Sequence, residues 1–330
     1  MPKFAALILF ALAIVLSFSA FARAQFDDDP KATGNLDQIA GSGPKLDSAA
    51  TKQIKIGVRI KASGGPCHGI ICTVPVPTDW PEQKVKQIQE DISPSIRTVS
   101  YRTLDGSVKQ MIIKIPDLVA GEEAHALVTF EITRASIQPP EDTTVFRECP
   151  KDKIPRDVLP YLSASPEIES AHPKIIALAR ETIEGKGDWE KVQAIYDVTR
   201  QKIKYQNGPL KGALKGLTDG TGDCEELTSL FIAMCRATGI PARTVWVPDH
   251  CYPEFYMVDG QGNGYWFPCQ AAGSAAFGGI PEHRPIMQKG DCFRDPDRPE
   301  KKLRYVSEFL KGVSGKNANK PQVDFVRDWN

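Results

Sequence analysis

The sequence has no excess of charge of either sign, no polybasic segment and no visible internal repeat. Its 41 lysine and arginine residues balance 41 aspartate and glutamate residues over 330 positions. This balance argues against a nucleic-acid-binding surface and against an electrostatic membrane anchor, because both depend on clustered positive charge. The lack of a repeat at solenoid or propeller periods argues against those architectures.

Metal-ligand spacings are absent as well. Neither C-x-x-C nor H-x-x-x-H occurs in the sequence, and these spacings are typical of zinc sites. A metal site built from cysteine and histidine is therefore weakly supported, and we expect no metal and no cofactor. Eight cysteines in 330 residues are too sparse for a disulfide-built scaffold. Their individual positions are therefore more informative than their number.

One long apolar run is present, at the start of the sequence. Lys3 precedes a run from Ala5 to Phe21 that contains only two serines, and Ala22-Arg23-Ala24 follows as a small-x-small cleavage site. This pattern predicts a signal peptide over residues 1–24, and with it a secreted, periplasmic or otherwise extracytoplasmic protein in an oxidising compartment. An uncleaved membrane anchor is the alternative, because about 17 apolar residues approach the length of a span. We expect no membrane span after cleavage.

The next segments change in composition. Residues 25–52 are rich in aspartate, glycine and serine, with few large apolar side chains, and we predict a flexible linker. From Ile54 to Ile60 apolar residues alternate with other residues, and four further short runs of this kind follow, separated by turn signals. Residues 53–140 are therefore predicted to form a β-sandwich-like domain, in which we find no chemistry.

After a proline-rich stretch, apolar residues recur at the helical period. The most informative helix is predicted to begin at Cys224, with Asp223 as its N-cap and Glu226 completing a capping box. A thiol at a helix N-terminus lies in the positive end of the macrodipole, which favours a nucleophilic thiolate, although Glu225 and Glu226 partly oppose this. Cys235 is expected to pack inertly in the core.

A nucleophilic thiol needs a base and a group that orients the base. Residues 250–258 and 265–270 are predicted to form two antiparallel strands joined by a glycine-rich turn. A register in which paired residue numbers sum to 520 places Gln270 opposite His250, and Cys251 opposite Cys269 on the other face. This register predicts a His–Gln pair and a possible Cys251–Cys269 disulfide.

Two further disulfides are considered for the remaining cysteines. A short separation favours Cys67 with Cys72, as a local bridge within a hairpin. Elimination then leaves Cys149 with Cys292.

These segments resemble the core of the transglutaminase-like superfamily. The resemblance rests on Gly222-Asp223-Cys224, on Arg236 with the turn that ends in Gly239-Ile240-Pro241-Ala242-Arg243, on His250 to Glu254 and on Trp266 to Gln270. It covers roughly residues 155–290 and implies a papain-like core, with a nucleophile at a helix N-terminus packed on an antiparallel sheet. With the β domain, this gives an α+β fold. Residues 291–330 are expected to form a C-terminal helix and a tail.

The resemblance also implies a papain-like Cys-His-Asp triad. Cys224 and His250 match the nucleophile and the base, whereas Gln270 stands where the family usually has aspartate. A neutral amide can accept the histidine N–H and fix its tautomer, but it cannot stabilise an imidazolium by charge.

Two functional hypotheses follow. The leading one is an exported enzyme with a cysteine nucleophile that transfers acyl groups from peptide or amide bonds, either to water or to an amine. Its partner would be a protein or peptide substrate, and no nucleic acid is expected. The alternative is a catalytically weak or inactive binding or scaffold module of the cell envelope, suggested by Gln270. The sequence does not indicate an oligomeric state.

Overall fold

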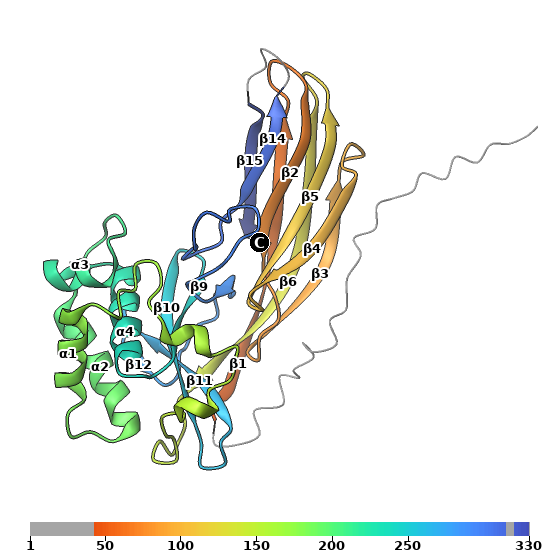
Figure 1. The fold of residues 1–330 in the computed structure, drawn as a ribbon. Coiled ribbons are helices and arrows are strands. Elements are labelled where there is room, and N and C mark those ends of the chain that lie inside the picture. The colour runs from red at the N-terminus through yellow and green to blue at the C-terminus, as the bar shows by residue number, and fades with distance from the viewer. Residues whose placement is uncertain (1–42, 315–319, 330) are drawn as a thin grey trace, which may run out of the picture.

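The computed structural model describes residues 43–314 and 320–329. The predicted signal peptide and most of the predicted linker lie outside these residues. The fold is α+β, as predicted: an elongated pair of antiparallel β-sheets stands beside a core of helices and a smaller sheet (Figure 1).

Two four-stranded sheets form the elongated sandwich, in the orders β15-β1-β6-β3 and β14-β2-β5-β4. Their strands are β1 (Lys45–Lys61), β2 (Cys67–Val76), β3 (Gln83–Ile92), β4 (Thr98–Leu104), β5 (Val108–Leu118), β6 (Glu123–Gln138), β14 (Phe309–Ser314) and β15 (Gln322–Trp329). The alternating residues Ile54, Ile56, Val58 and Ile60 are buried in the core between the sheets. The period of two in the sequence therefore reflects one inward-facing side of β1.

Both segments that flank this pattern were predicted incorrectly. Residues 45–52 belong to β1 and pair with β6, so the linker prediction is wrong there. Residues 291–330 were predicted to form a C-terminal helix and a tail, but residues 291–314 and 320–329 contain the strands β14 and β15 and no helix. β14 pairs with β2 and β15 with β1, and Val323 and Phe325 of β15 pack against the sandwich core. Polar strands of this kind are stabilised by a partner that is distant in the sequence.

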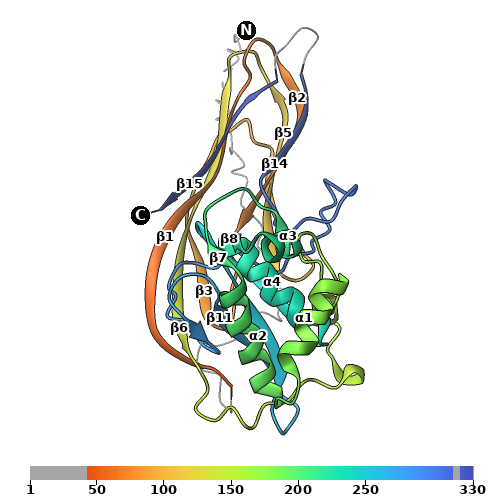
Figure 2. The ribbon, with the colours of Figure 1, turned by 90° about the vertical axis from the view of Figure 1, so that its left-hand side faces the viewer.

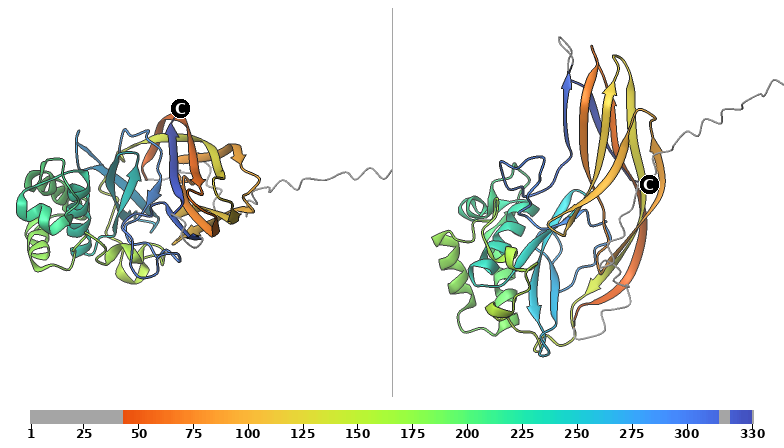
Figure 3. Two further views of the ribbon diagram at one scale, coloured as in Figure 1. Left: turned by 90° about the horizontal axis from the view of Figure 1, so that it is seen from above. Right: turned by 45° about the vertical axis from the view of Figure 1, so that its right-hand side comes forward.

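The remaining elements form a five-stranded sheet and a layer of helices beside the sandwich. This five-stranded sheet has the strand order β12-β11-β10-β9-β13, and neighbouring strands in it are antiparallel. They are β9 (Ala242–Val247), β10 (His250–Val258), β11 (Gly264–Gln270), β12 (Ala276–Phe277) and β13 (Gln288–Lys289). One face is covered by helices, and the other faces the sandwich (Figures 2 and 3).

The helices are α1 (Pro173–Ile183), α2 (Asp188–Lys202), α3 (Gly212–Asp219) and α4 (Cys224–Ala237). Short 3-10 turns, η1 (Lys151–Lys153) and η2 (Leu159–Leu162), precede them, and a parallel pair of short strands, β7 (Lys204–Tyr205) and β8 (Thr221–Gly222), lies next to α3. α4 is the central helix, since every residue from Glu226 to Arg236 is buried. A fully buried helix provides a rigid support for whatever its first turn presents.

Buried charges connect the sheet to the sandwich. The Lys289 ammonium on β13 donates to Glu82 at 2.7 Å and to Glu254 on β10 at 3.0 Å. Arg134 of β6 donates to the Tyr252 hydroxyl at 2.6 Å. Glu254, the acidic residue of the His-x-x-x-Glu segment, therefore has a structural role. These contacts hold β10, and with it His250, in a fixed position relative to the sandwich.

Candidate active site

The start of α4 is built as the sequence predicted. The Asp223 carboxylate accepts from the Glu225 N–H at 2.8 Å, and the Glu226 carboxylate accepts from the Asp223 N–H at 3.0 Å. Glu226 also accepts from the Lys211 N–H at 2.8 Å, which ties the preceding loop to the helix. A Cβ on Gly222 would lie 2.4 Å from the Glu226 Cβ, so glycine is needed before the cap. Cys224 is thereby held, half-buried, as the first residue of the helix.

His250 and Gln270 meet as predicted, although the predicted register is wrong. The His250 Nε2 lies 2.8 Å from the Gln270 Oε1. The pairs between β10 and β11 run from Glu254↔Pro268 to Val258↔Gly264, so residue numbers sum to 522 rather than 520. In the loop that connects the two strands, the Asp259 carboxylate accepts from the N–H groups of Gln261 and Asn263. The backbone pairing of β10 with β11 stops at Glu254, and the side chains of His250 and Gln270 meet beyond this last pair.

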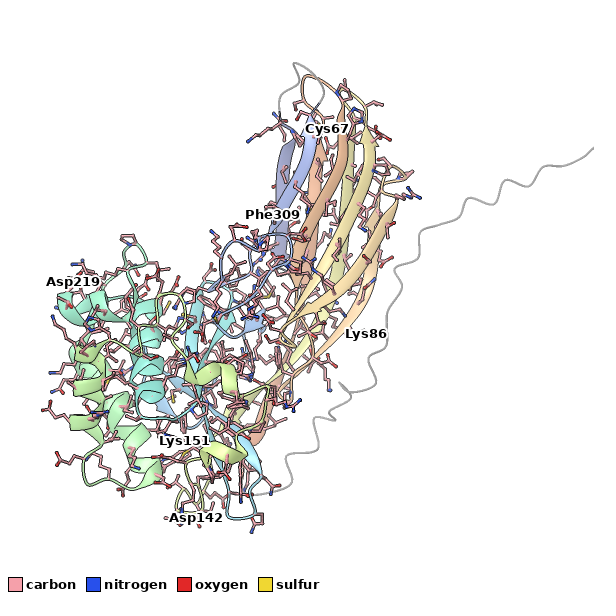
Figure 4. All side chains as sticks on the ribbon, viewed as in Figure 1. Cys67, Lys86, Asp142, Lys151, Asp219 and Phe309 are labelled. Atoms are coloured by element: carbon pink, nitrogen blue, oxygen red, sulfur yellow. The ribbon has the colours of Figure 1, made fainter. Side chains whose placement is uncertain are left out.

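The predicted disulfides are absent, since all eight cysteines are free. Cys67 and Cys72 lie on the single strand β2, so no hairpin brings them together, and Cys67 is at the end of the sandwich far from the helices (Figure 4). The shift in register separates Cys251 from Cys269. Cys149 packs beside Tyr256 and Val258. Cys292 instead lines a cavity of about 500 Å³ with Tyr161.

The environment of Cys224 favours its thiolate. A hydrogen bond from the Cys251 side chain, a hydrogen bond from His250 and the Cys251 backbone N–H together outweigh burial and lower the pKa of Cys224 to about 4. Burial alone would lower the pKa of His250, but hydrogen bonds to Cys224 and Gln270 raise it. A thiolate–imidazolium pair is therefore the stable form between these two pKa values.

This electrostatic arrangement predicts an unusual pH profile for alkylation. The rate at which iodoacetamide alkylates Cys224 should rise through pH 4 and reach its plateau by about pH 6. At that pH an ordinary thiol with a pKa of about 8.5 is still protonated. The buried Cys235, whose pKa is raised by burial, should stay unlabelled and serves as an internal control. Peptide mapping after timed labelling measures both. A midpoint near pH 8.5, or label on Cys235, would contradict the thiolate assignment.

An open cavity adjoins His250 and Gln270. It has a volume of about 710 Å³ and is lined by His250, Gln270, Leu227, Tyr205 and several basic residues, including Arg200 and Lys204. Tyr205 is 54% exposed at its rim. A cavity of this size and openness can admit an extended segment of a peptide.

Two residues on α2, whose contacts the sequence did not indicate, hold the end of β11. The Arg200 guanidinium donates to the Gln270 carbonyl at 3.1 Å and to the Ala271 carbonyl at 2.9 Å. The Tyr196 hydroxyl also donates to the Gln270 carbonyl, at 3.0 Å. The only signal in the sequence is their spacing of four on one helix face, which does not indicate what they contact.

In the described part of the chain, no group of three or more His, Cys, Asp or Glu side chains is arranged to hold a metal ion. Within the same residues, no helix combines the length and the apolar character needed to cross a membrane.

Comparisons with known proteins relate this part of the chain to a family and its fold to solved structures. The family model described as the transglutaminase-like superfamily matches residues 176–271, a segment that contains Cys224, His250 and Gln270. Among solved structures, a chain from Cytophaga hutchinsonii named "Putative Cysteine Protease" is similar, with a TM-score of 0.54 and 19% identity over 85% of this chain and 92% of that one. At this identity the likeness shows the fold alone.

A weaker likeness is to the periplasmic domain of TgpA from Pseudomonas aeruginosa, with a TM-score of 0.33 and 14% identity over 68% of this chain and 90% of that one. A likeness this weak carries no argument. No curated protein matches this chain.

Proposed function

Residues 176–271 form a domain of the transglutaminase-like superfamily, and on that basis we propose that the protein is an exported cysteine-nucleophile enzyme that transfers acyl groups from peptide or amide bonds. The observation that carries this proposal is the hydrogen-bonded series Cys224–His250–Gln270, in which the pKa of the thiol is lowered to about 4 and the pKa of the imidazole is raised. Export rests on the signal-peptide pattern of residues 1–24.

The first half-reaction follows from these positions. The Cys224 thiolate attacks the carbonyl carbon of the scissile amide, and the carbonyl oxygen becomes an oxyanion. The Cys224 backbone N–H, at the first position of α4, is the donor best placed to stabilise that oxyanion, because the next N–H is occupied by Asp223. The His250 imidazolium then donates its proton to the leaving amine. The products are an amine and a thioester on Cys224.

The second half-reaction regenerates the thiolate. His250, now neutral, accepts a proton from water or from an amine that attacks the thioester, and the acid or the new amide leaves. We favour water as the acceptor, because the cavity beside His250 is open. A peptide library incubated with the wild type and with Cys224→Ala tests the reaction, and added methylamine measures the share of acyl groups that an amine captures. Cleavage that persists in Cys224→Ala would refute the proposal.

Gln270 is proposed to orient the base. Its Oε1 accepts the Nε2–H of His250, which leaves Nδ1 as the ring nitrogen that exchanges a proton with Cys224. We expect Gln270→Ala to lower kcat/KM by about ten- to a thousand-fold, whereas Gln270→Asp should retain or raise it, since both effects act through His orientation. Steady-state kinetics on the best library peptide provide the measurement.

Gln261→Ala, in the exposed loop of the same hairpin, is the matched control and should leave kcat/KM unchanged. Equal activity of Gln270→Ala and the wild type would show that Gln270 does not orient His250.

The neutral Gln270 also keeps a second candidate function open, that of an inactive binding or scaffold module of the cell envelope. This alternative predicts that Cys224 is alkylated with the pH profile of an ordinary thiol and that no peptide in the library is turned over.

A further inference from the structure

A second thiol lies against the proposed nucleophile. Cys251 follows His250 on β10, and its Sγ lies 3.7 Å from the Thr228 Oγ1 on α4. The Thr228 hydroxyl in turn donates to the Cys251 carbonyl at 3.4 Å. Thr228 is one helical turn after Cys224 and shares its face of α4. The Cys251 side chain therefore packs beneath Cys224, and the two side chains are hydrogen-bonded to each other.

The two thiols differ in their access to solvent. Cys251 is 1% exposed, whereas Cys224 is half-buried at the N-terminus of α4, next to the exposed Tyr205 at the cavity rim. A small oxidant in the solvent therefore has access to Cys224 but not to Cys251. An accessible thiolate with an adjacent second thiol is the arrangement of a reversible oxidation site.

We propose that Cys224 and Cys251 are such a site, at which a peroxide converts the nucleophile into a disulfide that stops acyl transfer and protects the sulfur from irreversible oxidation. The inference rests on the proposed function only in taking Cys224 as the nucleophile. No part of it depends on which peptide the protein acts upon.

The chemistry proceeds in two balanced steps. The Cys224 thiolate attacks one oxygen of hydrogen peroxide, the O–O bond breaks, and the departing hydroxide takes a proton from the His250 imidazolium to give water. Cys224 is then a sulfenic acid. The Cys251 thiol loses its proton, its sulfur attacks the Cys224 sulfur, the S–O bond breaks, and the hydroxide leaves with that proton as a second water. Two thiols are oxidised by two electrons in total, and one peroxide is reduced to two waters.

The change in charge at Cys224 makes Cys251 competent for the second step. Burial raises the pKa of Cys251, and the hydrogen bond to Cys224 and the negative charge of its thiolate raise it further. A sulfenic acid is neutral, so the contribution of that charge disappears once the first step is complete. His250, neutral after the first step, lies next to the pair and can accept the Cys251 proton. A dithiol reductant reverses the reaction by attacking the disulfide.

The test treats the full chain with one equivalent of hydrogen peroxide and maps its peptides without reduction. We expect one cross-linked peptide pair joining Cys224 to Cys251, a mass loss of about 2 Da for the two thiol hydrogens, loss of iodoacetamide labelling at Cys224, and recovery of labelling after dithiothreitol. Cys269→Ala, which removes another buried cysteine of the same sheet, is the matched control and should behave as the wild type.

Cys251→Ala should behave differently. In parallel reactions of this variant and the wild type with two equivalents of hydrogen peroxide, the variant, which has no second thiol, should carry Cys224 to the sulfinic acid, with a mass gain of about 32 Da that dithiothreitol does not reverse. Cys251→Ser provides the same readout if the alanine variant does not fold. The inference fails if the wild type reaches the sulfinic acid as fast as these variants, or if Cys224 pairs with another cysteine. A disulfide that forms in a protein with no turnover on any peptide would refute the proposed function alone.

Discussion

His250→Ala is expected to remove nearly all peptide turnover. The value of kcat/KM should fall by about 10²- to 10⁴-fold, which is the usual contribution of a general acid–base residue. The same change should slow alkylation of Cys224 at pH 6. His250 contributes a hydrogen bond and a positive charge to the low pKa of that thiol, so its removal moves the pKa upward and reduces the thiolate fraction below neutrality. Kinetics and alkylation rates between pH 5 and pH 8 measure both effects.

Thermal stability provides the control for this variant. His250 lies at the start of β10 and is only partly buried, so its truncation should change Tm little. His125→Ala, in the sandwich and hydrogen-bonded to Ser93, should leave both turnover and alkylation unchanged. A large loss of Tm for His250→Ala together with fast alkylation would mean that the imidazole is a packing residue and not the base.

Asp291→Asn is expected to destabilise the fold by about 3–5 kcal/mol, the usual cost of leaving one member of a buried ion pair alone. The Arg236 Nη2 donates to both Asp291 carboxylate oxygens at 2.8 Å, and both side chains are fully buried. Asp291 also accepts from the Ser165 hydroxyl at 2.7 Å. An amide at this position leaves the guanidinium uncompensated where water cannot reach it.

Equilibrium denaturation measures this loss. Glu141→Gln, which removes an exposed ion pair with Lys45, should leave the denaturation midpoint unchanged. A loss below about 1 kcal/mol for Asp291→Asn would show that the pair is not desolvated as described. Because Arg236 also donates to the Ala242 carbonyl, the cost should appear as unfolding of the whole core rather than as local loosening of α4.

The features of the site that were predicted correctly depend on local signals. The N-cap Asp223, the return hydrogen bond from Glu226 and the exposed end of the apolar stripe are encoded within a few residues, so the position of Cys224 was predictable. His250 and Gln270 were paired correctly because they are long side chains at the open end of a short hairpin. The predicted contact between His250 and Gln270 is present although the predicted register differs from the observed one by two in the sum of paired residue numbers. The predicted Cys251–Cys269 disulfide depended on the same register and is absent.

The features that were missed depend on contacts between distant segments. Cys251 contacts a helix that begins 27 positions earlier in the numbering, and no periodicity within β10 indicates which helix covers it. Arg200 likewise acts on β11 through backbone carbonyls, which every residue has. The sequences of residues 45–52 and of β15 are typical of a polar linker and a polar tail. These segments form strands because each pairs with a strand that is distant in the sequence, and the local sequence does not indicate that partner.

The pairing of β15 with β1 and of β14 with β2 has a consequence for synthesis of the chain. Each sheet of the sandwich has a strand that is made only after the whole transglutaminase-like domain has been translated. Until then β1 and β2 expose unpaired backbone edges of the kind that invite association with other chains. The domain that carries Cys224 can complete its own sheet, β12-β11-β10-β9-β13, before β14 and β15 are made. The strands that are synthesised last therefore belong to the sandwich and not to the domain that carries the nucleophile.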